Sequence, residues 1–354
     1  DPDISLSLFT EGRRFLIPGY EIPGAIGSGT IATVYKAIRL SDGREAALKA
    51  LRPELAKHPH FVQAYLNEAG AVSRFHHPNI VQAFDIGEAN GIYYYAEELL
   101  SGGSLADRIR NGGPDFSEAA LLLFLRQTVA ALRHAWEAAV YHGDINPSNL
   151  RLDANGDIKL ANLGVPRVAT PSHGSGSIPD FVRGSLKYAA PEQLDNPELV
   201  NARTDIYSLG ATFYHVSFGT PPFSGDGEAQ LLDNRRDRPM PSFSLKCQDR
   251  FSNKYLRLLH QMLAVNPGER PADPEALSLQ LERFHQGADS SVIWPEQASR
   301  RLFFDPACLA PASAGRDRVF SLKPRVPAKK GTAGQAAALL LVLAAAAACL
   351  LWLC

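Results

Sequence analysis

The strongest constraint on the fold of this chain is a change in its hydrophobic periodicity. From about Gly19 to Glu97, apolar and polar residues alternate between Gly and Asp turns, with one helical stretch from Phe61 to Phe75. Alternation of this kind is typical of half-buried β-strands. From Leu105 to about Phe284 the apolar residues recur at helical spacing, as in AALLLFLRQTVAALRHAWEAAV. The sequence therefore predicts an α+β fold in which a small strand-rich lobe precedes a larger helical lobe.

Length, charge and cysteine content limit the classes of function. A chain of 354 residues is long enough for two lobes with their own cores and for additional segments. Its formal net charge is -1, so no overall field favours nucleic acid, and we expect no nucleic-acid partner. The four cysteines lack the paired spacing of a zinc site or a disulfide framework. They are Cys247, Cys308, Cys349 and Cys354. This usage suits a reducing, cytoplasmic compartment.

The end of the chain differs from both lobes. Residues 286–334 are rich in Ala, Ser, Pro and basic residues without periodicity, which indicates a flexible linker. Ala336 to Cys354 form an uncharged apolar run, about long enough to cross a hydrocarbon core roughly 30 Å thick. We expect a single transmembrane helix over residues 335–354. A buried or interfacial helix is the alternative, because the high Ala content makes the run only moderately hydrophobic.

A basic segment precedes the apolar run. It contains Arg316, Arg318, Lys323, Arg325, Lys329 and Lys330, opposed only by Asp317. The positive-inside rule then predicts a single-pass membrane protein whose preceding lobes lie in the cytoplasm. The same residues could instead only solvate the linker. Because the sequence begins with Asp1 rather than Met and ends inside or just after the apolar run, we expect the natural chain to extend further.

The most informative run for function is His142 to Gly164, HGDINPSNLRLDANGDIKLANLG. It resembles the catalytic and metal-binding loops of protein kinases, in which HRDxKxxN carries a catalytic Asp and a metal-binding Asn. A following DFG carries the Asp that holds magnesium against the nucleotide phosphates. In this resemblance Asp144 is the catalytic residue, Asn149 is a metal ligand, and Asn162 stands where the magnesium-binding Asp is expected.

The strand-rich lobe carries residues that resemble the nucleotide-binding side of the same family. In AIGSGTIATVYKA, Gly27 and Gly29 are followed by Val34, and glycines in such a loop let the backbone approach phosphates closely. Taken alone, this pattern is more often a structural hairpin. The resemblance is strengthened by Lys49 in EAALKAL, which matches the lysine that holds the α and β phosphates of ATP. Glu68 in YLNEAGAV matches the helical partner of that lysine.

The run YYYAEELLSGGSL resembles the hinge between kinase lobes. The resemblance implies that the backbone near Glu98 and Leu100 hydrogen-bonds an adenine edge. Glu97 then occupies a position that usually holds an apolar residue. A carboxylate is costly to desolvate there unless it is paired or points away. Either Glu97 reaches a cation or the nucleotide site is altered, and an alignment shifted by one residue is the remaining alternative.

Architectural motifs extend the resemblance over roughly Tyr20 to Phe284. Ala190 to Glu192 match the APE motif, and Arg270 matches the arginine that pairs with its glutamate. Asp205 matches the residue that holds the backbone of the catalytic loop. The sequences of these motifs most resemble those of bacterial serine/threonine kinases with a membrane anchor. The resemblance implies a flank over 1–18, a β lobe with one long helix over 19–97, and a helical lobe over 98–285.

Three exchanges weaken the machinery that the resemblance implies. Asn162 offers magnesium a neutral carbonyl in place of an anionic oxygen, so we expect Mg²⁺ binding to be weak or absent. Asn146 replaces a Lys that supplies positive charge beside the transferring phosphate. Gly143 replaces an Arg that usually receives a phosphorylated activation loop, which argues against such phosphorylation as the switch.

Three functions follow from these residues. The first is a pseudokinase that binds ATP through Lys49 and Glu68, transfers phosphate poorly or not at all, and acts by binding protein partners. The second is an active membrane-anchored serine/threonine kinase, in which Asn149 helps to hold magnesium while Asp144 orients a protein substrate hydroxyl. The third is a small-molecule phosphotransferase, against which the APE motif and the Asp205 helix argue. We favour the first, because two charges that stabilise the transition state are absent together.

Overall fold

The computed structural model describes residues 17–29, 31–112, 116–163, 186–196, 199–223 and 250–286. All of them lie in the first of two compact units, Asp1–Asp305 and Pro306–Cys354. None of the helices described here combines the length and the hydrophobicity that a membrane-spanning segment needs. The predicted span from Ala336 to Cys354 lies outside the described residues, as does the predicted linker apart from its first residue, Gln286.

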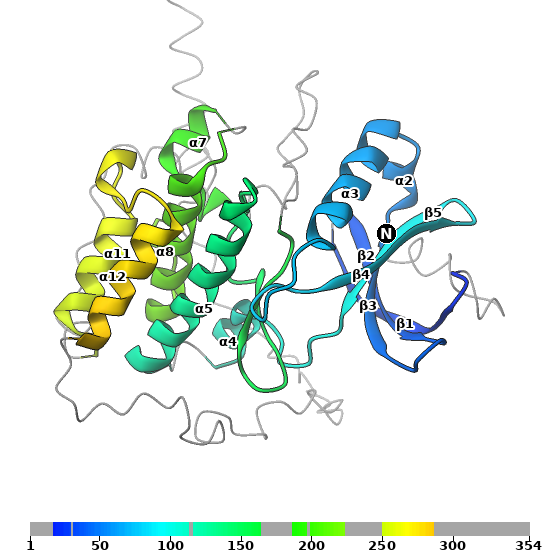
Figure 1. The fold of residues 1–354 in the computed structure, drawn as a ribbon, viewed down its shortest axis with the longest axis horizontal. Coiled ribbons are helices and arrows are strands. Elements are labelled where there is room, and N and C mark those ends of the chain that lie inside the picture. Colours follow the sequence, from blue (N-terminus) through cyan, green and yellow to red (C-terminus); the bar gives the residue numbers. More distant parts are fainter. Residues whose placement is uncertain are drawn as a thin grey trace, which may run out of the picture. The chain divides into compact units, whose positions relative to one another are not determined.

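The N-terminal part forms one antiparallel five-stranded sheet, in the order β1-β2-β3-β5-β4 (Figure 1). Its strands are β1 (Tyr20–Ser28), β2 (Ala32–Arg39), β3 (Glu45–Leu51), β4 (Ala83–Ala89) and β5 (Ile92–Glu98). Burial alternates along β2, whereas the central β3 is buried along most of its length. The alternation that predicted strands is therefore clearest away from the middle of the sheet, as expected where only one face is covered.

Helix α3 (Pro59–Val72) covers one face of this sheet and contacts β4 and β5, and the short α2 (Pro53–Ala56) lies beside it (Figure 1). Pro59 occupies its first turn, where a missing N–H costs no helical hydrogen bond. The helix buries Tyr65, Ala69 and Val72 in the same apolar cluster as Tyr95 of β5. Lys49 and Glu97 therefore lie on strands that α3 helps to cover.

The C-terminal part is mainly helical, with one short hairpin. Its elements are α4 (Leu105–Gly112), α5 (Glu118–Glu137), β6 (Leu150–Leu152), β7 (Ile158–Leu160), α7 (Pro191–Asp195), α8 (Ala202–Phe218), α11 (Asn253–Met262), the 3₁₀ turn η1 (Pro267–Glu269) and α12 (Pro274–Gln286). Helix α5 contacts α12, and α8 contacts α11. The two-lobed α+β fold implied by the sequence is confirmed for this part of the chain.

Helix α8 is the centre of the helical lobe, and its ends are specified by the sequence. At its start the Asn201 side chain accepts hydrogen bonds from the backbone N–H groups of Arg203 and Thr204. At its end Gly219 adopts a φ of +77°, a left-handed conformation that glycine takes without strain. Most of the helix between these caps is buried. Asp205, in its first turn, is held rigidly and is 3% exposed.

The connection between the sheet and the helical lobe is fastened to the β6–β7 hairpin. Gly102 N donates to Leu152 O at 3.1 Å, and Leu152 N donates to Gly103 O at 2.9 Å. A Cβ atom on Gly102 would lie 2.6 Å from Leu152 O, so only glycine allows this approach. On the other strand of the hairpin, Val81 N donates to Leu160 O at 3.0 Å. The hairpin therefore joins the chain segments that lead to the candidate site.

Candidate functional site

The loop before β6 is hydrogen-bonded to α8 through one buried carboxylate, that of Asp205. Asp205 Oδ2 accepts from His142 N at 2.7 Å, and Asp205 Oδ1 accepts from Gly143 N at 2.8 Å. Hydrogen bonds to an ionised acceptor are about twice as strong as neutral ones. The predicted role of Asp205 is therefore confirmed, because its carboxylate fixes the backbone that leads directly into Asp144.

Two further residues shape this loop. The His142 ring is 1% exposed; its Nε2 lies 2.9 Å from Ala161 O, and its Nδ1 accepts from Asp144 N at 3.2 Å. Gly143 has a φ of +77°, a region in which most other residues are strained. The exchange of Arg for Gly at this position therefore removes a charge and also relieves the backbone.

A chain of side-chain hydrogen bonds links four predicted site residues from both lobes. Lys49 Nζ donates to Asn162 Oδ1 at 2.8 Å. Asn162 Nδ2 donates to Asn149 Oδ1 at 2.8 Å. Asn149 Nδ2 donates to Asp144 O at 2.8 Å and to Asp144 Oδ2 at 3.2 Å. Residues far apart in the sequence thus meet at one site, and each of the two side-chain amides uses both its oxygen and its nitrogen within the chain.

Lys49 also pairs with Glu97, the acidic residue of β5 at a position that is usually apolar. Its Nζ lies 2.9 Å from Glu97 Oε1, and the two side chains are 12% and 7% exposed. It also donates to Tyr95 Oη at 3.0 Å. Glu97 therefore reaches a cation, which is one of the two outcomes that its position allowed. Either charge would be costly at this depth without the other, because an unpaired buried charge loses its hydration without compensation.

The predicted nucleotide-binding residues of the sheet form a cross-strand row. Gly27 pairs with Val34, Val34 pairs with Lys49, and Lys49 pairs with Tyr95. Directly opposed residues share a face of a sheet, so the four lie side by side. In the turn between β1 and β2, Gly29 N donates to Ala32 O at 2.9 Å. The side chain of Glu68, the predicted partner of Lys49, lies outside the described part of the structure.

The hinge residues are anchored from behind. Glu98 Oε1 accepts from Lys159 Nζ at 2.7 Å and from Gln82 N at 2.9 Å. Leu100 is buried and shares a small apolar cluster with Val81 and Ala161. Ala161 precedes Asn162, so this cluster connects the hinge to the polar chain. The structure places Glu98 and Leu100 near the other candidate residues, and their contact with adenine stays a prediction.

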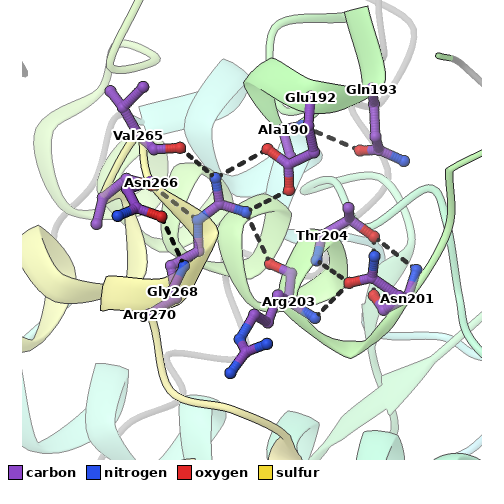
Figure 2. A network of polar contacts seen from close by, with 11 residues as sticks. Ala190, Glu192, Gln193, Asn201, Arg203, Thr204, Val265, Asn266, Gly268 and Arg270 are labelled. Carbon is purple, nitrogen blue, oxygen red and sulfur yellow. Dashed lines mark hydrogen bonds and ion pairs between the residues drawn. The ribbon is translucent and has the colours of Figure 1, made fainter. Parts of the chain in front are cut away.

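The segment containing Ala190 to Glu192 is fixed to the helical lobe by one arginine (Figure 2). Arg270 Nη1 donates a hydrogen bond to Glu192 Oε1 at 2.7 Å, and Arg270 Nη2 donates one to Glu192 Oε2 at 2.9 Å. Arg270 also donates to the carbonyl oxygens of Ala264, Arg203 and Val265. Its side chain is fully buried. The predicted ion pair is therefore confirmed, and its bidentate geometry satisfies both charged groups.

Tyr188, just before that segment, is held by α8. Its Oη lies 2.8 Å from His215 Nδ1, and the two rings stack. Burial raises the pKa of the Tyr188 hydroxyl. Burial and the nearby Lys187 lower the pKa of His215. Both groups are therefore neutral at pH 7, so this contact is a neutral hydrogen bond that orders the segment beside the site.

The fold and the site together define a protein kinase domain, and comparison with known proteins agrees. The protein kinase domain family matches residues 20–281, so the chain belongs to the protein kinase family. The chain is 33% identical over 223 residues to serine/threonine-protein kinase PrkC of Bacillus subtilis, covering 63% of this chain and 34% of that protein. It is 31% identical over 273 residues to serine/threonine-protein kinase PknB of Mycolicibacterium smegmatis, covering 76% of this chain and 43% of that protein.

A third relative is a probable serine/threonine-protein kinase of Corynebacterium efficiens, 32% identical over 227 residues and matched over 34% of its length. The chain thus spans between about a third and less than half of the length of these three relatives. Its resemblance to bacterial serine/threonine kinases, predicted from the sequence, is confirmed. The family uses ATP and Mg²⁺ to transfer phosphate to protein hydroxyls.

Sequence reasoning did not anticipate the contact of Tyr95 with Lys49, and it left the partner of Glu97 open. The pairing of β3 with β5 indicates both contacts. Tyr95 lies directly opposite Lys49, and Glu97 lies opposite Ala47, two residues before Lys49 on the same face. Diagonal neighbours on one face of antiparallel strands are within reach of long side chains. Aligning EAALKAL against YYYAEE in this register would have predicted the ion pair.

Proposed function

We propose that this protein kinase domain is a pseudokinase: it binds an adenine nucleotide, transfers phosphate poorly or not at all, and signals by binding protein partners. The observation that carries the proposal is the hydrogen-bonded chain from Lys49 through Asn162 and Asn149 to Asp144. In this chain the two residues at metal-ligand positions bond to each other. Positioning by metal ions is the main source of catalysis in phosphoryl transfer, so its loss removes most of the rate.

The donor set does not fit a tightly held magnesium ion. Mg²⁺ requires hard oxygen ligands in near-octahedral geometry, usually including one or two carboxylates. Asn149 Oδ1 already accepts from Asn162 Nδ2, and Asn162 Oδ1 already accepts from the Lys49 ammonium. A cation at either oxygen would have to share it with one of these bonds, and it would gain no anionic ligand from Asn162. Among the described residues, no group of three or more His, Cys, Asp or Glu side chains could hold a metal ion.

Asn146 supports the same proposal. Its Nδ2 donates to Asp144 O at 3.0 Å, and its Oδ1 accepts from Ser148 N at 2.9 Å. The side chain is 8% exposed. Asn146 thus closes a turn of the loop, where serine/threonine kinases place a lysine whose charge meets the transferring phosphate. The loop keeps its shape without the cation that stabilises the transition state.

One observation favours an active kinase instead. Asp144 is present, and its loop has the full support of Asp205 and His142. A nucleotide that brought its own magnesium could then react if Asn149 turned its oxygen toward the ion. We rank this function second, because the ion would gain no carboxylate at position 162, where the amide of Asn162 is already bonded to Asn149.

The proposal also covers the C-terminal residues, which follow the kinase domain. We infer that residues 335–354 anchor the kinase domain to a membrane and that residues 286–334 link the two, with the kinase domain on the cytoplasmic side. Fractionation of cells that express the chain with and without residues 335–354 tests this. Recovery of both forms in the same fraction would contradict it.

The first test is nucleotide binding with and without metal. We expect ATP in EDTA to raise the melting temperature about as much as ATP with excess magnesium, because the site offers the ion no anionic anchor. Differential scanning fluorimetry at matched ionic strength measures both shifts. A substantially larger shift with magnesium would favour the active kinase, and no shift in either condition would contradict nucleotide binding.

The second test is residual phosphate transfer. Asp144→Asn is expected to change the transfer rate to a generic protein substrate by less than about twofold, because the unmodified site has little activity to lose. The measurement is incorporation of labelled phosphate from ATP with magnesium. Robust transfer by the unmodified chain, abolished by Asp144→Asn, would overturn the pseudokinase proposal in favour of the active kinase.

A further inference from the structure

The Lys49 ammonium is already engaged by groups of the protein itself. Its Nζ donates hydrogen bonds to Asn162 Oδ1 at 2.8 Å and to Tyr95 Oη at 3.0 Å. It also forms an ion pair with Glu97 Oε1 at 2.9 Å. An ammonium has three N–H donors and no acceptor, so two of the three are used in these hydrogen bonds. A phosphate oxygen that binds Lys49 has to share the ammonium with all three groups.

Glu97 also changes the charge that a phosphate would meet. Its carboxylate lies next to the ammonium on the same face of the sheet, and both side chains are nearly buried. A phosphate in contact with Lys49 would lie roughly twice as far from Glu97 as from the ammonium. By Coulomb's law the carboxylate then cancels about half of the attraction. Asp144 adds a second negative charge at the far end of the polar chain.

Resting on the proposed nucleotide binding, we propose that Glu97 is the specificity-determining residue of this site. By holding Lys49, it prevents the phosphate tail from contributing to binding. The ligand class is therefore the adenine nucleoside and its phosphate esters, accepted with little regard to the number of phosphates. Affinity comes from the nucleoside part, against the hinge and the apolar cluster of Val81, Leu100 and Ala161.

The test compares adenosine, AMP, ADP and ATP in EDTA by isothermal titration calorimetry with the full chain. We expect the unmodified protein to bind adenosine and ATP with affinities within about threefold of each other. Glu97→Gln keeps the shape of the side chain but removes its charge. It is expected to raise the ratio of ATP affinity to adenosine affinity about tenfold or more, because Lys49 is then a net positive group.

A matched control is Lys159→Gln. It breaks the neighbouring ion pair with Glu98, which has a similar length and burial, without touching Lys49. The affinity ratio should not change in this variant. Glu97→Met serves as a second variant if Glu97→Gln does not fold. A preference of the unmodified protein for ATP above about tenfold, or a ratio that Glu97→Gln leaves unchanged, would overturn the proposal.

The failure of nucleotide binding and the failure of this inference give different results. If the unmodified protein binds neither adenosine nor ATP, the proposed function fails. In that case ATP binding gained by Glu97→Gln still supports the role of Glu97, and its absence overturns that role.

An independent readout is the rate at which an acylating reagent modifies Lys49, followed by peptide mass spectrometry. The internal reference is Lys36, whose side chain is partly exposed and pairs with Glu45. Glu97→Gln should accelerate modification of Lys49 several-fold, and Lys159→Gln should not. Equal rates in the unmodified protein and Glu97→Gln would overturn the proposal.

Discussion

Glu192→Gln is expected to lower the free energy of unfolding by about 3 kcal/mol, because it leaves the buried charge of Arg270 without its counter-ion. Arg270 is fully buried and makes a bidentate pair with this carboxylate. The three backbone carbonyls around Arg270 remain and keep the loss at the lower end of the range for broken buried pairs. Urea denaturation followed by circular dichroism measures the change.

Glu275→Gln is the matched control for this experiment. Glu275 pairs with Arg133 at 3.0 Å in the same lobe, but both side chains are more than two-fifths exposed. Exposed ion pairs contribute at most about 1 kcal/mol, so this variant should unfold nearly as the unmodified protein does. Equal losses in the two variants would show that burial does not govern the Glu192–Arg270 pair.

Asn162→Asp is expected to raise magnesium-dependent phosphate transfer about 100-fold from its low baseline, on the scale of single electrostatic groups in active sites. Asn162 has a φ of +58°, in the left-handed region where Asn and Asp are both enriched, so the backbone should accept the change. A carboxylate oxygen would then face Asn149 Oδ1, where the amide Nδ2 now donates at 2.8 Å. Two facing oxygens repel unless a cation lies between them, so the substitution should create a metal site.

Three comparisons make this experiment decisive. Asn146→Lys added to Asn162→Asp should increase transfer further, because it restores charge beside the phosphate. Asn155→Asp is the control: it adds the same charge on the exposed β6–β7 turn, outside the site, and should leave transfer at baseline. If Asn162→Asp gains neither transfer nor a magnesium-dependent melting shift, the missing carboxylate is not the cause of low activity.

Much of the architecture could be predicted from the sequence because its residues have one dominant physical role. Arg270 and Asp205 are buried charges and Glu192 is a partly buried one. A charge removed from water must have a partner, so the family motifs that contain these residues also specify their contacts. The same logic anticipated that Glu97 would need a cation or a different orientation. The β-strands and the long helix of the first lobe followed from hydrophobic periodicity, although periodicity predicted the helix over Phe61 to Phe75 and the structure has it over Pro59–Val72.

The local sequence around Lys49 gives no indication of the three side chains that contact its ammonium. Glu97 and Tyr95 lie more than 40 residues further along the chain, and Asn162 lies 113 residues away. Their meeting depends on the register of β3 against β5 and on the path of the chain after β7. Motif matching assigned Glu68 as the partner of Lys49, and because the Glu68 side chain lies outside the described part of the structure, that assignment stays a prediction. Glu97 is an ion-pair partner that the motifs did not assign.

The sequence by itself determined the family, the two lobes and the loss of an anionic ligand at Asn162, because covalent identity settles which groups are charged. Only the tertiary structure decided what those groups do to one another. A hydrogen bond has a short reach and strict direction, so whether an amide oxygen faces a cation or a neighbouring amide depends on packing. In this protein packing joined Asn149 to Asn162 and Lys49 to Glu97.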